Sequence, residues 1–545
     1  MKARPFLLAF GAALLSGCAA RPFVAPSCDE CVSIDKRIKS GRVAGERLEM
    51  PKTDALFYRG QSVGAVWSTG GCLLPRADAL IDALRKSDIE GLTPTEYHLR
   101  VLEKLRRQWP DPSDAAATAS LVADMDALLT DAYLFYASHL LGGRTNLEMA
   151  RAQWSIIRKK ADIVELLASS LANNQVVESL GPLAPPHAGY VRLRAALDRY
   201  RKLARAGAWK PIPDGPLIKR GDRDDRVPAI RRRLALEALS EPPLESTTTF
   251  DGALAESVKS FQATRGLRPD GRIGAETLAA INVSVDDHIN QIKFSMDRWR
   301  WLPSDLGSRY VVVNIPEFHL FAFEDGRARM AMSVIVGKNN DETATPVFSN
   351  KMTYLEFSPE WNVPQRIAVE EMLPTIQRDA DYLRRNHLEV LVAAHGEWAP
   401  VDPATIAWSS VTAAGFPYRI RQTPGPWNGL GQVKFMFPNE YNVYIHGNAE
   451  SGLFDRRLRT FSHGCVRVDH PINLARWVLN DPDWTLDRLK QYMNQSKPIT
   501  VPLGEALPVY LVYFTSWVDD QGRLNFREDI YGRDQEMRNR FYPGN

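Results

Sequence analysis

The hydrophobic pattern of this chain changes its period near Arg309, and this change constrains the fold more than any other feature of the sequence. Before it, apolar side chains recur every three or four positions, as in "ADALIDALRKSDIEGL", which indicates helices. After it they alternate, as in "RYVVVNIPEFHLFAFEDGRARMAMSVIVG", which indicates strands, and Asp325-Gly326 is typical of a hairpin turn. We therefore expect a multidomain α+β protein, helical at first and mainly β afterwards.

Length and sequence breaks divide the chain further. At 545 residues it is too long for a single hydrophobic core. A Pro-rich stretch, "WKPIPDGP", follows the long helical region, and the helical stretch "VEEMLPTIQRDADYLRRNHLEVL" interrupts the later strands. The expected parts are a signal peptide over 1–17, a tether over 18–45, an all-helical scaffold domain over 46–207, a small three-helix module over 215–285, a mainly β domain over 290–505 with a helical insertion over about 366–420, and a C-terminal extension over 506–545.

The first residues have the pattern of an export signal. Basic residues precede an apolar run over 5–15 that is too short to span a bilayer as a helix. The quartet Leu15-Ser16-Gly17-Cys18 resembles a bacterial lipobox, which implies cleavage before Cys18 and attachment of acyl chains that anchor the protein to a membrane. A plain secretory signal is the alternative. Since no aspartate follows Cys18, the resemblance favours the outer membrane, with the protein in the periplasm.

The charge balance argues against one class of partner. The net charge is +3 from 68 basic and 65 acidic residues, so a dedicated nucleic-acid binder is not expected. This balance is compatible with weak attraction to an acidic polymer such as cell wall. No cofactor and no metal is expected, and the oligomeric state and the partners of the helical region are left open.

Five cysteines have to be placed. If Cys18 is lipidated, an even number remains, which favours two disulfides. Cys28 and Cys31 are close enough in sequence to pair locally, which leaves Cys72 and Cys465 without obvious partners. A zinc site at Cys28 and Cys31 lacks a second pair of ligands nearby.

The three-helix module carries a recognisable pattern. Its apolar residues lie on one face of each helix, and Asp270-Gly271 makes a turn before the last one. The pattern Phe261-Gln262…Gly266-Leu267…Asp270-Gly271…Gly274…Thr277 resembles the peptidoglycan-binding domain type 1. The resemblance implies binding to peptidoglycan. A helical spacer that has kept this fold and lost the ligand is the alternative.

The stretch "FSHGCVRVDH" contains the candidate catalytic residues. In an extended segment, residues two apart share a face, so His463, Cys465 and Arg467 are expected to point the same way. An imidazole beside a thiol favours the nucleophilic thiolate and acts as general acid and base, and Arg467 adds a fixed positive charge. Gly464 leaves room for a carbonyl carbon, and its amide and that of Cys465 are candidate donors to an oxyanion.

A histidine upstream completes a family pattern. His446 ends a predicted strand in "YNVYIHGNAE", and the His…Ser-His-Gly-Cys arrangement, with Ser462 as its serine, resembles the L,D-transpeptidase (YkuD-type) catalytic domain. The segments "RWRWLP", "ATPVF", "PEWNVP" and "RQTPGPWNGLGQVKFMFPN" resemble the large multidomain branch of this family. That branch commonly has an aspartate after the first histidine, where Gly447 stands here, so contacts to an incoming amine at this position are in doubt.

The resemblance also suggests substrate contacts, and other roles compete with it. His446, Ser462, Gly447 and Arg467 are candidate substrate-binding residues. Trp361 and Trp427 either line a substrate groove or pack in the core. Without its neighbours, Cys465 is more typical of a buried or disulfide-bonded cysteine. A metal site built from His446, His463, Cys465 and His470 is a further alternative, although residues two apart on a strand are not typical paired ligands.

The resemblance implies a reaction on peptidoglycan stem peptides. The Cys465 thiolate attacks the carbonyl of the third residue, a diamino acid, and expels the terminal D-alanine, while His463 takes and returns the proton. A side-chain amine of a second stem then resolves the thioester and gives a 3→3 cross-link. Water has to be excluded, and the insertion is the candidate lid. A protein lysine or water as acceptor, or a non-catalytic wall-binding lipoprotein, are the alternatives.

Overall fold

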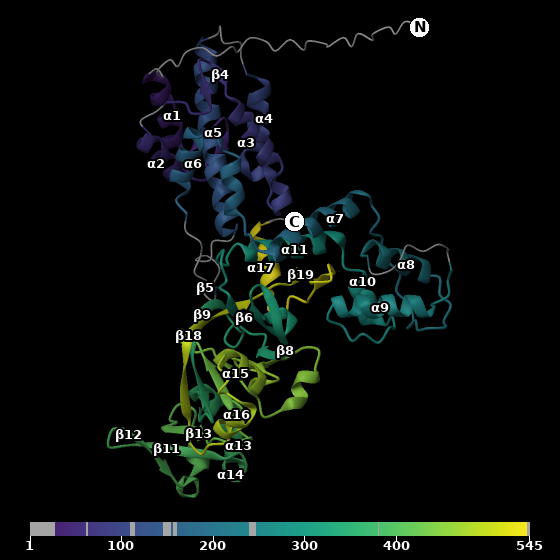
Figure 1. Cartoon of the computed structure of the whole chain (residues 1–545), viewed down its shortest axis with the longest axis vertical. Coiled ribbons are helices and arrows are strands. Elements are labelled where there is room, and N and C mark those ends of the chain that lie inside the picture. The colour runs from purple at the N-terminus through teal and green to yellow at the C-terminus, as the bar shows by residue number, and fades with distance from the viewer. Residues whose placement is uncertain are drawn as a thin grey trace. The chain divides into compact units, whose positions relative to one another are not determined.

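The computed structural model describes residues 28–61, 64–109, 115–144, 154–155, 161–238, 247–379 and 381–541 (Figure 1). These residues form two compact units, one within 1–141 and 160–184 and the other within 142–159 and 185–545. The expected signal peptide and the lipidation site Cys18 lie outside the described residues. Within the described ranges, no helix has both the length and the apolar character needed to cross a membrane.

The first unit is helical. Its helices are α1 (Cys28–Ser40), α2 (Pro51–Gln61), α3 (Pro75–Arg85), α4 (Leu99–Arg107), α5 (Ala115–Gly142) and α6 (Ile163–Ala172). α5 is apolar around much of its circumference, which is typical of a helix at the centre of a core. Ile34 and Ile38 of α1 pack in the same core, so this part of the expected tether belongs to the folded unit. Cys72, in β4 (Cys72–Leu73), is disulfide-bonded.

Helix α7 (Ala188–Arg205) belongs to the second unit. The sequence places it in the helical scaffold because its periodicity continues that of the preceding helices. In the structure it packs against α11 (Val285–Trp299), and the buried Tyr190 accepts a hydrogen bond from Arg300 at 2.7 Å. The scaffold domain is expected to end at residue 207, whereas the first compact unit of the structure ends at residue 184.

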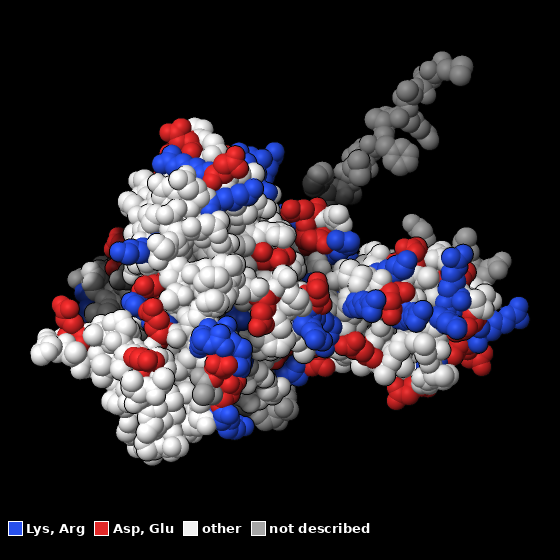
Figure 2. Space-filling model, turned by 90° about the horizontal axis from the view of Figure 1, so that it is seen from below, with Lys and Arg blue, Asp and Glu red and all other residues white. Residues whose placement is uncertain are grey.

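The small module consists of α8 (Val227–Leu236), α9 (Gly252–Thr264) and α10 (Ala275–Ile281). Its apolar positions meet in one core, as the sequence predicts. The buried Gln262 donates to Asp270, to the Arg272 carbonyl and to Thr277, and accepts from the Gly271 amide. Lys and Arg side chains are mixed with Asp and Glu side chains on this lobe, at the right of Figure 2, as over the rest of the visible face.

The strands predicted after Arg309 form a closed sheet. β6 (Arg309–Asn314), β7 (His319–Glu324) and β8 (Arg327–Gly337) are consecutive antiparallel strands, and Asp325 and Gly326 both have positive φ in the predicted hairpin turn. The other members of the ring are β9 (Val347–Phe357), β14 (Val433–Met436), β15 (Ile445–His446), β17 (Val466–Val468) and β18 (Ile499–Val512). The order β14-β15-β17-β8-β7-β6-β18-β9 closes into a barrel because β14 also pairs with β9.

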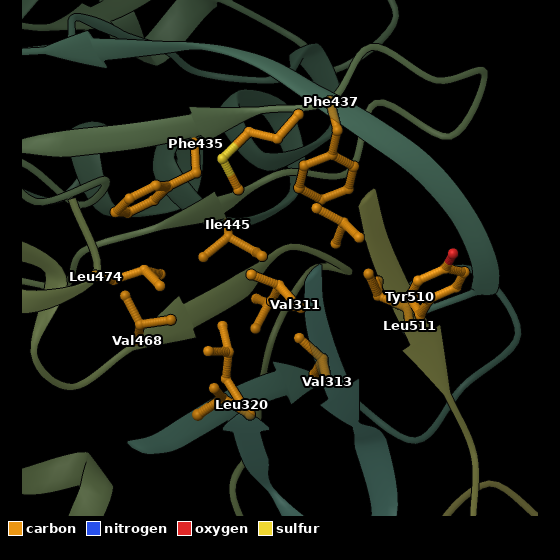
Figure 3. Close-up of a cluster of buried hydrophobic side chains, with 14 of the residues drawn as sticks. Val311, Val313, Leu320, Phe435, Phe437, Ile445, Val468, Leu474, Tyr510 and Leu511 are labelled. Atoms are coloured by element: carbon orange, nitrogen blue, oxygen red, sulfur yellow. The ribbon is translucent and has the colours of Figure 1, made fainter. Parts of the chain in front are cut away.

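Apolar side chains from these strands fill the barrel (Figure 3). Val311 and Val313 of β6 lie in one cluster with residues of β14, β15 and the neighbouring strand β18. Helix α15 (Pro471–Leu479) adds Leu474 to the same cluster. β18 pairs with β6 through residues 509–512, so the strand crosses the expected domain end at 505 and the first residues of the expected extension lie in the sheet.

The insertion folds as a small subdomain of its own. Its helical part is limited to short pieces: α12 (Gln365–Ile367), the π-helical turn η5 (Ala368–Met372), α13 (Leu373–Ile376) and α14 (Tyr382–Arg385). The rest is a four-stranded sheet of β10 (Trp361–Asn362), β11 (Leu388–Ala394), β12 (Glu397–Val401) and β13 (Tyr418–Gln422). The insertion is thus mixed α and β. The sequence does not reveal these strands because they are short and because the apolar run at the start of β11 fits a helix equally well.

We expect Leu511→Ala to destabilise the barrel. Leu511 is fully buried in β18, between β6 and β9, so truncation leaves a cavity and lowers the free energy of unfolding by about 3 kcal/mol. Urea unfolding followed by tryptophan fluorescence measures the change. Leu486→Ala is the matched control: Leu486 is 41% exposed, and its truncation should cost less than about 0.5 kcal/mol. Equal costs for the two variants would contradict the closed core.

Candidate active site

Cys465 lies at the end of a short bend between two strands. β16 (Thr460–Ser462) ends before the bend, and β17 begins directly after Cys465. Gly464 has a φ of +117°, a conformation that favours glycine. The chain is therefore not extended here, and the premise that placed His463 on the same face as Cys465 is wrong.

Two hydroxyl groups hold this bend. Ser462 Oγ donates to the Cys465 carbonyl at 2.6 Å and accepts from the Gly464 amide at 3.2 Å. The buried Thr345 Oγ1 donates to the Gly464 carbonyl at 2.9 Å and accepts from the Gly337 amide at 2.8 Å. The Gly464 amide, expected as an oxyanion donor, is thus engaged within the bend. The Cys465 amide makes no hydrogen bond to any other described residue.

The pairing of β15 with β17 decides which side chains lie near the sulfur. The two strands run parallel, with His446 opposite Arg467. Since alternate residues share a face, Tyr444, His446, Cys465 and Arg467 lie on one side of the sheet. The residues between them point into the barrel core. The register therefore places His446, Arg467 and Cys465 on the same face of the sheet.

Cys465 is a free thiol, and it is partly buried. Its Sγ lies 3.7 Å from the Asn442 carbonyl oxygen. Burial raises the pKa of the Cys465 thiol, while the backbone N–H and the phenol of Tyr444 and the charges of Lys434 and Arg467 act in the opposite direction. The resting thiol is therefore protonated at neutral pH, and the groups around it favour the thiolate that an acylation requires.

His446 is a buried, neutral imidazole. Burial, and then the charge of Arg467, lowers the pKa of His446 to about 3. Hydrogen bonding to the backbone of Gly447 and Leu430 acts in the opposite direction, and Nδ1 has no hydrogen-bond partner among the described residues. A neutral imidazole keeps one ring nitrogen with a free lone pair, which is the form of a general base.

His463 has a different environment. Its Nε2 lies 2.7 Å from Glu371 Oε1 and 3.1 Å from Lys338 Nζ, and Lys338 Nζ lies 3.3 Å from the same carboxylate oxygen. No hydrogen bond joins His463 to Cys465 among the described residues. Burial opposes ionisation of Glu371, but the hydrogen bond and charge of His463 and the charge of Lys338 outweigh it, so the pKa of Glu371 is lowered. His463 is thus bonded to the insertion, which contributes Glu371.

Gly447 is explained by close backbone packing. A Cβ on Gly447 would lie 3.3 Å from the Gly431 Cα, and a Cβ on Gly431 would lie 2.7 Å from the Gly447 Cα. Gly431 also has a φ of +64°. The two glycines let two chain segments approach each other beside His446, so a side chain at 447 would require the neighbouring backbone to move.

Two other predicted contacts are not part of this cluster. Trp361 packs on the core of the insertion, and Trp427 stacks on His387 with ring centroids 3.7 Å apart. Trp361 therefore packs in a core, which favours this alternative over a place in a substrate groove. Across the described ranges, no group of three or more His, Cys, Asp or Glu side chains could hold a metal ion, which leaves the alternative metal site without support.

Sequence reasoning missed Thr345, Tyr444 and Glu371. Thr345 stands in "ATPVF", a segment whose resemblance to the family gave no role for its threonine. Tyr444 stands two residues before His446, at the spacing of a shared strand face, so this signal was present in the sequence. Glu371 carries no such signal, because its contact with His463 joins residues 92 positions apart.

We expect the Tyr444→Phe variant to alkylate at higher pH than the wild type. The phenol favours the thiolate, so its loss should raise the pKa of Cys465 and move the midpoint of the pH–rate curve upwards. The measurement is the rate of iodoacetamide modification across pH, read by intact mass. Tyr418→Phe, a change in the insertion strand β13, should leave the midpoint in place. A lower midpoint for Tyr444→Phe would contradict the assigned contact.

Three regions of the chain match known domain families. Residues 308–501 match the L,D-transpeptidase catalytic domain, YkuD. Residues 223–281 match the family described as "Putative peptidoglycan binding domain", and residues 54–197 match the scaffold domain. These are the three resemblances that the sequence motifs indicate.

Individual proteins are similar to parts of the chain. A Haemophilus influenzae protein named "Putative L,D-transpeptidase" is 35% identical over 258 residues, which are 47% of this chain and 51% of the relative. This chain thus spans about half the length of that curated relative. Crystal structures of L,D-transpeptidases from Xylanimonas cellulosilytica (17% identity, TM-score 0.18, 55% of this chain and 100% of that chain) and Stackebrandtia nassauensis (13%, 0.22, 55% and 96%) are also similar. At TM-scores this low, we draw no conclusion about fold or function from these two structures. On the three domain matches, the β region of this chain is an L,D-transpeptidase catalytic domain, joined in one polypeptide to a peptidoglycan-binding domain and a scaffold domain.

Proposed function

We propose that this protein is an L,D-transpeptidase that cross-links peptidoglycan through a thioester on Cys465. The observation that carries the proposal is the free thiol of Cys465 on the same sheet face as a neutral imidazole, within a region that matches the catalytic domain. The substrates are stem peptides of peptidoglycan, and the peptidoglycan-binding domain supports this choice. Anchoring through a lipid on Cys18 in the periplasm, at the outer membrane, belongs to the same proposal.

The first half-reaction forms the thioester. The sequence assigns the proton transfer to His463, but the geometry favours His446, whose imidazole is neutral and shares the sheet face of the thiol. His446 takes the thiol proton as the sulfur attacks the carbonyl of the third stem residue, and then gives it to the departing D-alanine amine. Arg467 and Lys434 favour the thiolate electrostatically. The amide of Cys465 is the better oxyanion donor, since Ser462 engages the amide of Gly464.

The second half-reaction transfers the acyl group. A side-chain amine of another stem attacks the thioester, the carbon–sulfur bond breaks, and Cys465 is regenerated with a 3→3 cross-link formed. The thioester conserves the energy of the broken peptide bond, so no nucleotide is consumed. Water competes as a nucleophile, and the insertion, which contributes Glu371 beside His463, is the element proposed to exclude it. A protein lysine as acceptor would use the same acyl-enzyme.

We expect Cys465→Ala to abolish cross-linking of purified tetrapeptide stems and acylation by a carbapenem, while binding to isolated wall is retained. The sulfur is the atom that forms the thioester, and the module at 215–285 does not depend on it. Product mass separates transfer to a stem from hydrolysis. His446→Ala should slow acylation by roughly 10²-fold or more through loss of the base. Full acylation of the His446 variant would return the base assignment to His463, and an unreactive thiol in the wild type would refute the enzyme altogether.

We expect excision of the insertion to raise hydrolysis relative to transfer. The neck of the insertion is narrow: Asn428 Nδ2 donates to the Pro359 carbonyl at 3.0 Å, and β9 and β14 pair directly beyond it. Residues 360–427 can therefore be replaced by a short glycine linker without cutting the barrel. The measurement is the ratio of tripeptide to cross-linked product, which should increase severalfold. An unchanged ratio would rule out water exclusion by the insertion.

A further inference from the structure

A charged pocket lies where the insertion meets the barrel. It has a volume of about 210 Å³ and is open to solvent between the loop after β8 and the start of the insertion. Its charged lining consists of Lys338, Glu342, Arg366, Glu370, Glu371 and His463. Cys465 lies two residues after His463, so the pocket adjoins the bend that carries the nucleophile.

The charges in this pocket are arranged in two sets. Arg366 forms ion pairs with Glu342 and with Glu370, the latter at 2.9 Å. Lys338 and His463 share the carboxylate of Glu371. Three carboxylates thus face two permanent cations, which leaves one net negative charge when His463 is neutral. Such a pocket favours a ligand that carries an ammonium group, and Arg366 and Lys338 can receive a carboxylate on the same ligand.

The hydrogen bond to Glu371 determines the state of His463. Nε2 makes its shorter contact, at 2.7 Å, with the carboxylate, which can only accept, so we take Nε2 as protonated and Lys338 Nζ as a donor to Glu371 rather than to the ring. Nδ1 is then the ring nitrogen left outside these contacts. Glu371 stays ionised, because its contacts with His463 and Lys338 lower its pKa against the effect of burial. An anionic partner on Nε2 orients the imidazole, so Nδ1 is the nitrogen at which His463 can accept a proton.

We propose that this pocket is the binding site of the acceptor, an amine with a carboxylate on the same carbon, and that His463 is the base that deprotonates this amine, with Glu371 as its positioning residue. The inference rests on the proposed function. It gives the two histidines separate tasks: His446 serves the thiol in acylation, and His463 serves the acceptor in transfer.

The proposed transfer step moves two protons away from the acceptor nitrogen. The acceptor enters as an ammonium ion, and Nδ1 of His463 takes one proton from it. The free amine attacks the thioester carbonyl, a carbon–nitrogen bond forms, and the carbon–sulfur bond breaks. The sulfur leaves as the thiolate of Cys465, and the attacking nitrogen loses its second proton as the amide forms. The protons held by the imidazole and the nitrogen pass to the thiolate and to solvent, which restores the resting protonation.

The test compares two nucleophiles on the same acyl-enzyme. The donor is a tetrapeptide stem, and the acceptors are 2,6-diaminopimelate, which arrives as an ammonium ion, and hydroxylamine, which is already unprotonated at neutral pH. For Glu371→Gln we expect transfer to diaminopimelate, divided by the rate of acylation, to fall about tenfold or more, while transfer to hydroxylamine falls much less. Glu397→Gln makes the same change on an exposed residue of β12 in the insertion and should alter neither ratio.

Two other outcomes would contradict the proposed acceptor site. Equal losses with both nucleophiles would mean that Glu371 only holds the insertion in place, and no loss with either would mean that the pocket is not used; both overturn the inference. Acylation of the wild type, read by intact mass, is measured in the same samples. If Cys465 of the wild type is never acylated, the proposed function fails instead. Glu371→Asp, which keeps the carboxylate, should restore part of the transfer to diaminopimelate.

Discussion

The pairing of β14 with β9 is the interaction on which the site depends. It joins the two ends of the sheet, so the barrel has an apolar interior and no open edge at this position. β14 in turn pairs with β15, and β15 with β17, which fixes the register of His446 against Arg467. Because side chains alternate along a strand, the same register that directs Ile445 and Val466 into the core directs Tyr444 and Cys465 to the other face.

Burial keeps the side chains of Cys465 and His446 neutral. Burial raises the pKa of Cys465 and lowers that of His446, so an ion pair between them is unfavourable before substrate arrives. Arg467 and the phenol of Tyr444 reduce the cost of forming the thiolate. The bend held by Ser462 and Thr345 keeps the sulfur in place with little freedom to adjust.

The insertion is bonded to the bend that precedes Cys465. Glu371 lies in a π-helical turn, a distortion that often occurs at functional sites, and it is bonded to His463. In the small module, the residues that carry the family resemblance hydrogen-bond to one another. There Gln262 ties Asp270, Gly271 and Thr277 together, so these residues identify the fold of the module and leave its ligand to be tested. The hydrogen bonds of Gln262 therefore give the motif of the small module a role in holding its fold.

The sequence alone determined the α+β class, the domain families and the strands from β6 to β8, and it singled out Cys465 as the candidate nucleophile, because periodicity, turn residues and the Ser-His-Gly-Cys motif are all local. Only the tertiary structure decided that Cys465 faces His446 rather than His463, that the insertion contains its own sheet and that α7 packs outside the helical unit. These facts depend on strand register and on contacts between distant residues, such as Glu371 and His463. Short-range spacing carries no information about such contacts, since each is set by how separate elements pack.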